Sequence, residues 1–192
     1  MFCFDVETLG VESTSVILSY AIVYFDPDTR PSYQQLLDNT LFAKLDVKDQ
    51  IKNYERTVDE PVMTWWGKQH EWVRKVSLDP SPNDMSVDVA LDVLDKYISR
   101  FPNRDQQTFW ARGTLDSACL ESLYRSVGKE PIVPFNAWRD VRTAIDILYG
   151  TSNGYCDVDH NTFNRDNVIK HHPAHDVCYD VMMLLYGKQR NE

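Results

Sequence analysis

The sequence predicts an α/β domain with a mixed central β-sheet flanked by α-helices, and three observations support this fold class. Near the N-terminus, strand-length segments show either alternating apolar and polar residues or an almost unbroken apolar run. Apolar residues in the later part of the chain recur at helical spacing. Short apolar strands lie between those helical segments, an order typical of α/β and α+β sheets. The 192 residues fit one domain, 1–192, that is large enough to bury its own core.

The first half of the chain is expected to hold a strand meander followed by two helices. Strands are predicted at residues 2–6, 16–25 and 34–45. Residues 57–61 combine a capping-box pattern with a proline in the first turn, which predicts a helix from about residue 60 to 76. After a loop rich in proline and aspartate, Ser86 is expected to cap a second helix that runs to Ile98.

The second half is expected to alternate short strands with helices. Strands are predicted at residues 108–111 and 135–138, and helices at 116–127, 141–149 and 173–186. Gly113 separates the first of these strands from the helix that follows. Residues 152–167 are polar with few apolar anchors, so this segment is expected to be a loop.

The charge balance limits the kind of partner. Lys and Arg number 20 and Asp and Glu number 29, which gives a net charge of −9. A protein that coats duplex nucleic acid with a uniformly basic surface is therefore not expected, whereas a local phosphate site, or one bridged by metal ions, stays open. The apolar run at residues 16–25 is too short to span a bilayer. A signal peptide would carry Lys or Arg before its apolar segment, and none precedes this run. Neither a signal peptide nor a membrane partner is therefore expected.

The four cysteines, Cys3, Cys119, Cys156 and Cys178, form no CxxC pair. Buried, reduced thiols in a cytoplasmic protein are the expected interpretation.

A pair of carboxylates on the first predicted strand is the first candidate for chemistry. Asp5 and Glu7 are two residues apart, so both point to one face, opposite Phe4 and Val6. Two neighbouring anions on a core strand cost free energy unless a cation neutralises them. Oxygen ligands favour Mg²⁺ or Mn²⁺ in that role. A strand end where both carboxylates reach water stays open as the alternative.

Further acidic residues occur at the starts of two predicted helices. Asp116 lies at a strand-to-helix corner, where an acidic residue in the first helical turn is common. Asp176 and Asp180 are four apart and share one face of the last helix, with His175 at its start. Taken alone, each feature also fits a solvated helix end.

Taken together and in order, these segments resemble the three motifs of DEDDh 3′–5′ exonucleases, which have a ribonuclease H-like fold. The matching segments are Phe4–Gly10 (FDVETLG), Gly113–Asp116 (GTLD) and His175–Asp180 (HDVCYD). Two further segments resemble the DexA-type branch found in tailed phages and some bacteria: Thr64–Gln69 (TWWGKQ) and Trp138–Thr143 (WRDVRT). The resemblance spans residues 2–185. As a departure, Arg112 stands where such proteins often carry Asn.

The last motif fits two registers. His175 with Asp180 and His171 with Asp176 have the same spacing of five residues. We favour His175 with Asp180, because Val177 then occupies the position of a small apolar residue, usually Ala, and Asp180 lies one turn into the helix.

The resemblance implies a two-metal phosphodiesterase. Asp5, Glu7, Asp116 and Asp180 would bind two divalent ions, Mg²⁺ or Mn²⁺, that stabilise charge on both sides of an in-line displacement. His175 would be the general base, a role that its unperturbed pKa of about 6.5 suits. The expected substrate is single-stranded DNA or RNA with a free 3′ end, and the expected product is nucleoside 5′-monophosphate. The expected location is the cytoplasm, or the host cytoplasm if the protein is phage-encoded. A homodimer stays open, because relatives are often dimers.

Four residues are expected to contact the substrate. By the same resemblance, Thr8 and Leu9 would meet the terminal nucleotide. From their side-chain types, Trp66 could stack on a base and Arg142 could contact phosphate. Core packing of Leu9 and Trp66, and a surface ion pair for Arg142, stay open as alternatives.

Other functions compete with the exonuclease hypothesis. A catalytically silent module of the same fold that binds nucleic acid or protein is the main one, although such modules usually lack one or more of the carboxylates. An endonuclease of the same fold would share the paired carboxylates. A zinc module would use residues whose spacings fit no common finger: Cys156, His160, His171, His172, His175 and Cys178.

Overall fold

The computed structural model describes residues 1–101, 106–161 and 163–189. Its centre is a five-stranded sheet in the order β3-β2-β1-β4-β5. The strands are β1 (Phe2–Thr8), β2 (Ile17–Tyr24), β3 (Leu41–Lys44), β4 (Phe109–Ala111) and β5 (Trp138–Asp140). β2 pairs antiparallel with both β1 and β3, whereas β4 pairs parallel with both β1 and β5. The predicted mixed sheet is therefore confirmed.

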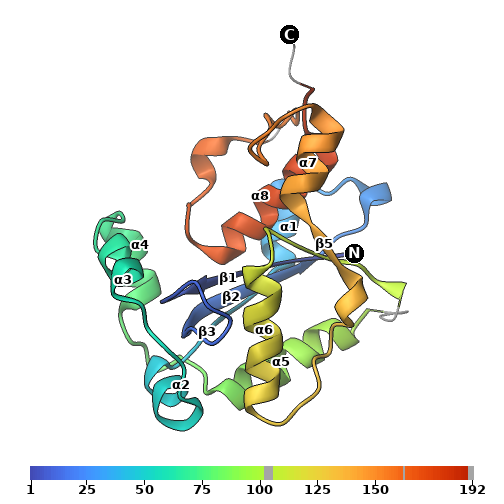
Figure 1. Cartoon of the computed structure of the whole chain (residues 1–192). Helices are drawn as coiled ribbons and strands as arrows, with labels where there is room; N and C mark the ends of the chain where they lie inside the picture. The colour runs from blue at the N-terminus through green and yellow to red at the C-terminus, as the bar shows by residue number, and fades with distance from the viewer. Residues whose placement is uncertain (102–105, 162, 190–192) are drawn as a thin grey trace.

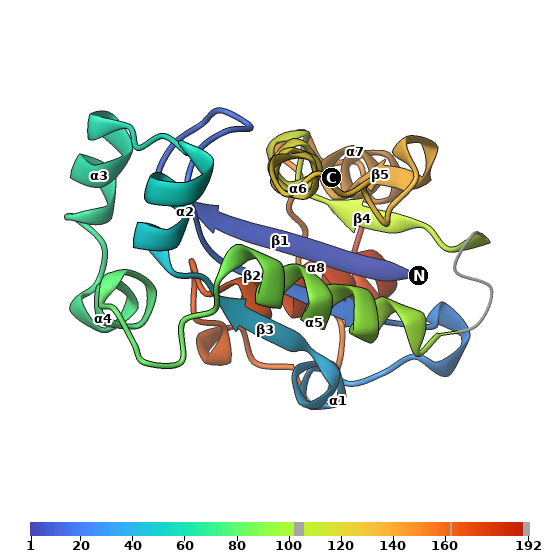
Figure 2. The ribbon, with the colours of Figure 1, turned by 90° about the horizontal axis from the view of Figure 1, so that it is seen from below.

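Helices pack on both faces of this sheet (Figure 1). They are α1 (Tyr33–Asn39), α2 (Val47–Tyr54), α3 (Glu60–Trp66), α4 (Glu71–Leu78), α5 (Val87–Ser99), α6 (Leu115–Ser126), α7 (Val141–Tyr149) and α8 (Pro173–Tyr186). Single 3₁₀ turns occur at Pro27–Thr29, Phe135–Ala137 and Arg165–Asn167. Figure 2 shows α5 in front of the sheet and α8 behind it, with α3 and α4 beyond the carboxyl end of β1.

The alternation of β1 divides the core between the two faces. Phe2, Phe4 and Val6 pack with α5 and α6, whereas Cys3 packs with α1, α7 and α8. Asp5 and Glu7 share the side of Cys3, because successive side chains of a strand point to opposite faces. The strand therefore carries its two carboxylates on the face that α8 covers, as the sequence predicts.

Three predicted segments differ from the observed elements. The strand expected at 34–45 is a helix, α1, followed by the short β3, because Ser32 and Gln35 form a reciprocal capping box. The helix expected at 60–76 is two helices, α3 and α4, with Gly67 at the end of the first. The strand expected at 135–138 begins only at Trp138, after a 3₁₀ turn.

One helix, α2, was not expected from the sequence. It starts at Asp46, whose carboxylate accepts the main-chain N–H groups of Lys48 and Asp49. The segment 152–167 is irregular apart from the turn at Arg165–Asn167, and residue 162 of this predicted loop lies outside the described residues.

The cysteines are buried and unpaired, as expected. Cys156 and Cys178, considered above as zinc ligands, pack in the apolar core between α8 and the sheet, and Cys178 is itself a residue of α8. Within the described ranges, every helix is too short or too polar to cross a membrane.

Candidate active site

A cleft with a volume of about 1340 Å³ opens at the carboxyl ends of β1 and β4. The starts of α6 and α8 border it, so segments far apart in the sequence contribute side chains to one site. Its inner part is lined by five carboxylates and one imidazole, from Asp5, Glu7, Asp116, Asp176, Asp180 and His171, and Asp157 lies on its wall. Four of the five predicted catalytic and metal-binding residues therefore lie in one cleft.

The two carboxylates of β1 are unfavourably placed unless a cation is present. Burial, and then the charge of Asp116, raises the pKa of Asp5 well above its usual range. Among the described residues, nothing donates a hydrogen bond to the buried Oδ2 of Asp5. Burial, followed by the charge of Asp176, likewise raises the pKa of Glu7. An unpaired carboxylate oxygen in such a place costs free energy that a bound metal would offset.

Asp116 lies in the first turn of α6, as predicted. Its Oδ2 accepts the main-chain N–H of Arg112 at 3.2 Å, which fixes the carboxylate toward the end of β4. Burial raises the pKa of Asp116 to about 7, although that hydrogen bond opposes the shift. The strand-to-helix corner around Gly113, with φ of +79°, allows the chain to make this turn.

Two aspartates on α8 reach the same cleft but have different partners. The Oδ2 atom of Asp176 accepts the main-chain N–H of His171 at 3.0 Å. Burial, and then the charge of Asp180, raises the pKa of Asp176 to about 7. Asp180 lies one turn further along the helix, and its Oδ1 is 2.8 Å from Nε of Arg112. Burial raises the pKa of Asp180 to about 6, while Arg112 favours its charged form.

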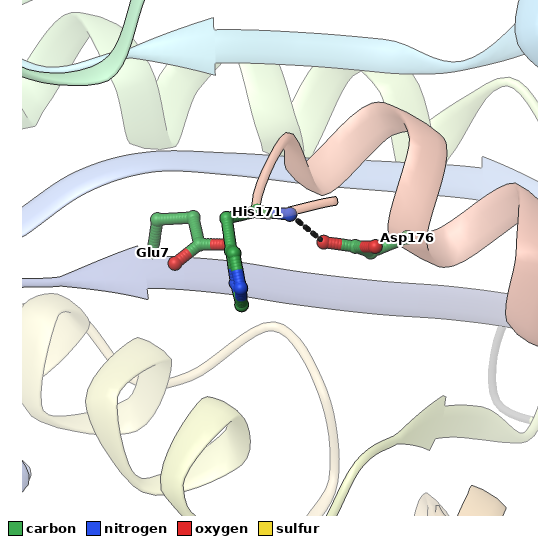
Figure 3. A group of neighbouring side chains, drawn as sticks. All are labelled: Glu7, His171 and Asp176. Atoms are coloured by element: carbon green, nitrogen blue, oxygen red, sulfur yellow. Dashed lines mark hydrogen bonds and ion pairs between the residues drawn. The ribbon is translucent and has the colours of Figure 1, made fainter. Parts of the chain in front are cut away.

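His171 faces the carboxylates from the segment before α8. Its Nδ1 is 3.8 Å from Oε1 of Glu7. Ligand atoms of Glu7, His171 and Asp176 all lie within 4.8 Å of one another. Figure 3 shows the imidazole between Glu7 on β1 and Asp176 on α8. The edge of the Trp65 ring packs against this imidazole, with the ring centroids 4.8 Å apart.

The position of His175 differs from the one expected. Its Nδ1 is hydrogen-bonded to the hydroxyl of Tyr33 in α1 at 2.7 Å, and it does not line the cleft. The reason is helical geometry. At about 100° per residue, positions five apart within one helix lie about 140° apart around its axis. His175 and Asp180 both belong to α8, so they cannot face the same site, whereas His171 precedes the helix and can.

The expected substrate contacts divide into buried and accessible residues. Trp66 is fully buried and Leu9 is 5% exposed, and both pack in a small core under α3 and α4. The indole N–H of Trp66 donates to the carbonyl of Thr8 at 3.0 Å, and the Thr8 hydroxyl donates to the carbonyl of Gly10. Arg142 is exposed and lines the cleft. Neither Trp66 nor Leu9 is placed to touch a substrate directly.

Two residues at the site were missed or set aside in reasoning from the sequence. Of the two adjacent tryptophans, Trp65 is accessible, with 40% of its surface exposed, and Trp66 is not. His171 was considered but not preferred. The signal that identifies it is Pro173 at the first position of α8, which places the preceding histidines outside the helix.

The donor set fits a divalent metal ion. Carboxylate oxygens predominate, and one of them is buried without a partner among the described residues. Burial first, and the neighbouring anions second, raise the pKa values of Asp5 and Glu7, and a bound cation would counter both effects. Hard oxygen ligands of this kind suit Mg²⁺ or Mn²⁺.

The sheet order, together with acidic residues that β1, α6 and α8 bring to one cleft, is the arrangement of the ribonuclease H-like nucleases. Residues 1–186 match the model of the Rv2179c-like 3′–5′ exoribonuclease domain, and the chain belongs to this family of DnaQ-like 3′–5′ exonucleases. It is also 25% identical over 206 residues to the exodeoxyribonuclease of Enterobacteria phage T4, an alignment that covers 97% of this chain and 88% of the relative. The resemblance drawn from the motifs is thereby confirmed at the level of a 3′–5′ exonuclease.

Proposed function

We propose that the protein is a DEDDh exonuclease of the phage-type branch that removes nucleoside 5′-monophosphates from the free 3′ end of single-stranded DNA or RNA. The observation that carries this proposal is the convergence of Asp5, Glu7, Asp116, Asp176 and His171 on one cleft. The family match and the phage relative support the reaction class. The family is described as exoribonuclease and the relative as exodeoxyribonuclease, so both substrates enter the test. We place the reaction in the cytoplasm, or in the host cytoplasm for a phage-encoded protein.

Asp5, Glu7, Asp116 and Asp176 would hold two divalent ions, Mg²⁺ or Mn²⁺. When bound, these ions would stabilise negative charge on both sides of the phosphodiester displacement. This assignment replaces Asp180, the expected ligand, with Asp176. The reason is that Asp180 already forms an ion pair with Arg112, in which Oδ1 lies 2.8 Å from Nε. In this assignment Asp180 positions Arg112.

His171 would take the proton from the attacking water. Burial lowers the pKa of His171, which keeps its imidazole neutral and able to accept a proton near neutral pH. The adjacent Trp65 ring limits the positions of the imidazole and shields it from solvent. A general base of this kind contributes about 10²- to 10⁴-fold to the rate.

Substrate contacts follow from accessibility. Trp65, exposed beside His171, would contact the terminal nucleotide, and Arg142 would contact phosphate. Trp66 and Leu9 would not touch the substrate but would hold the end of β1 in place. There the indole N–H of Trp66 donates to the carbonyl of Thr8.

The test is a time course on matched single strands of DNA and RNA, labelled at the 5′ end, with Mg²⁺, Mn²⁺ or EDTA. A ladder that shortens from the 3′ end and disappears in EDTA is expected, with at least one of the two strands degraded. A covalently closed single strand should stay intact, because it has no 3′ end; its cleavage would indicate an endonuclease. Absence of cleavage with every metal would overturn the enzyme proposal in favour of a binding protein.

A further inference from the structure

The cleft extends beyond the carboxylates to a wall of which the proposed function uses only Arg142. Four exposed side chains line this wall, and we call them the cationic arm: Arg142 on α7, Tyr155 and Arg165 in the loop between α7 and α8, and Lys188 after α8. Asp157 lines the same wall, and Lys188 is paired with Asp159 at 3.3 Å, so Arg142 and Arg165 supply most of its positive charge in a chain whose net charge is −9. Such a combination of cations and an aromatic ring is typical of grooves that bind single-stranded nucleic acid.

The ring of Tyr155 is held in place by Arg112, which packs on one of its faces. The guanidinium carbon of Arg112 lies 4.1 Å from the centroid of the Tyr155 ring, so one face of the ring is covered. Arg112 is itself fixed, since it donates from Nε to Asp180 and from Nη2 to the carbonyl of Gly154 at 3.0 Å. The Tyr155 residue is nevertheless 44% exposed and lines the cleft. Its uncovered surface is therefore available for stacking.

The loop that carries Tyr155 is also fixed from the side of α7. The carboxylate of Asp146 accepts the hydroxyl of Thr151 at 2.6 Å and the main-chain N–H of Gly154 at 2.8 Å. Gly154 has φ of +70°, and a Cβ atom there would lie 2.6 Å from Cβ of Arg142. The backbone of the loop thus packs directly on Arg142, and the arm is organised before any ligand binds.

The arm leads away from the reacting centre. His171 precedes α8 and Asp176 lies in its first turn. Asp180 lies one turn further on, paired with Arg112 from the end of β4, and the thiol of Cys156, next to Tyr155, contacts the carbonyl of Met183 near the end of α8. A strand whose terminal nucleotide lies beside His171 and Trp65 would therefore leave the carboxylates along this wall.

We infer that the cationic arm binds the nucleotides on the 5′ side of the scissile phosphate, with a base stacked on Tyr155 and phosphates held by Arg142, Arg165 and Lys188. This inference rests on the proposed function. Stacking and charge recognise features common to all bases and to both sugars. The arm should therefore bind DNA and RNA strands alike, with the choice between them made elsewhere.

The test compares a long substrate with a short one that has no nucleotide on the 5′ side of the scissile phosphate. The long substrates are 12-residue single strands of DNA and of RNA, and the short one is the p-nitrophenyl ester of thymidine 5′-phosphate. Tyr155→Ala should lower kcat/KM on the 12-mer by roughly 5- to 100-fold, mainly through KM, as expected for loss of one stacked base. The loss on the ester should be several-fold smaller. Tyr155→Phe keeps the ring and should restore the activity on the 12-mer.

The charged residues have their own measurement. Arg142→Gln combined with Arg165→Gln should reduce the salt dependence of 12-mer binding in Ca²⁺, by about 0.7 in the log–log slope for each phosphate that the variant no longer neutralises. The control is Lys52→Gln, which also removes one positive charge for each substituted residue. Lys52 is exposed on α2 and lies outside the cleft.

The outcomes separate the two proposals. If the unmodified protein degrades neither 12-mer nor ester with any metal, the proposed function fails. If it degrades them and Tyr155→Ala lowers activity equally on both substrates, or on neither, the inference about the arm is overturned while the function stands. If Tyr155→Ala does not fold, the arginine pair gives the answer: a salt dependence of binding equal to that of Lys52→Gln would overturn the inference.

Discussion

The main-chain N–H of His171 donates to the carboxylate of Asp176 across 3.0 Å, and this bond closes the turn that leads into α8. His171 adopts a left-handed backbone conformation with φ of +62°, which costs about 1–2 kcal/mol for a residue with a Cβ atom. The hydrogen bond holds that conformation and thereby directs the imidazole toward Glu7. A single main-chain contact thus positions both the proposed base and a proposed metal ligand.

The choice between the two histidines can be tested by substitution. His171→Ala should lower kcat by about 10²-fold or more, because it removes the proposed general base. His175→Ala removes the bond to the Tyr33 hydroxyl outside the cleft, and it should change kcat less than about threefold. Single-turnover kinetics on a labelled single strand measure both variants. A larger loss for His175→Ala would restore the register that the sequence favoured.

The two aspartates of α8 should also differ. Asp176→Asn should abolish nearly all turnover with Mg²⁺ or Mn²⁺ while the protein stays folded, because a proposed metal ligand is lost. Asp180→Asn weakens the ion pair with Arg112 and should retain measurable turnover, with a raised KM. Circular dichroism confirms the fold of each variant before kinetics. Equal inactivation with unchanged KM would indicate that Asp180 binds metal after all.

The clustered carboxylates predict how stability depends on pH without metal. The pKa of Asp176 is raised to about 7 in the folded state, above an ordinary value near 3.9. The folded protein therefore holds this proton between about pH 4 and 7 while the unfolded chain releases it, so this group's contribution to stability falls as pH rises through that window. Asp176→Asn should consequently be more stable than the unmodified protein at pH 8, by on the order of 2 kcal/mol.

Urea unfolding in EDTA at pH 5 and pH 8 measures this effect. The comparison is made between Asp176→Asn and the unmodified protein because buried histidines act in the opposite direction; burial lowers the pKa of His172 to about 4. Addition of Mg²⁺ at pH 8 should stabilise the unmodified protein more than the variant. A variant that is less stable at pH 8 in EDTA would contradict the prediction.

Trp65 and Trp66 should have separable effects. Trp66→Ala should destabilise the protein by about 3–5 kcal/mol, because the residue is fully buried and leaves a cavity. Trp66→Phe removes the N–H that binds the Thr8 carbonyl and should cost about 1–3 kcal/mol. Trp65→Ala should change stability by about 0.5 kcal/mol or less and weaken substrate binding instead. Denaturation curves and single-strand affinity in Ca²⁺ distinguish these effects, and a stable Trp66→Ala variant with reduced affinity would contradict them.

The sequence predicts the fold best where residues that start or end a helix agree with the spacing of the apolar residues. Both α7 and α8 occur at the predicted residues, because Asp140 and Gly150 limit the first and Pro173 starts the second. The prediction fails at α1, where the segment could also read as a strand and a local capping box decides for a helix. It fails again at 60–76, where Gly67 caps the end of α3 and both α3 and α4 pack on one small core through Trp66 and Val73.

The site is predictable in type and only partly in detail. Paired residues on one strand, Asp5 and Glu7, follow directly from alternation, and Asp116 follows from the strand-to-helix corner. The histidine register does not, because two pairs share one spacing. Counting degrees of rotation from Pro173 would have placed His175 on another side of α8 from Asp180. The accessibility of Trp65 and the burial of Trp66 depend on the tertiary position of α3, which local pattern does not specify.

The pairing of β1 with a strand more than a hundred residues later has a consequence for the protein during its synthesis. Phe2 lies opposite Phe109 in the sheet, and the cleft receives its last carboxylates from Asp176 and Asp180 on α8. A nascent chain that ends before residue 171 has Asp5, Glu7 and Asp116 but neither His171 nor Asp176. Such a chain would lack part of the proposed site, so an activity that needs this site would begin only once α8 has been made and has docked on the sheet.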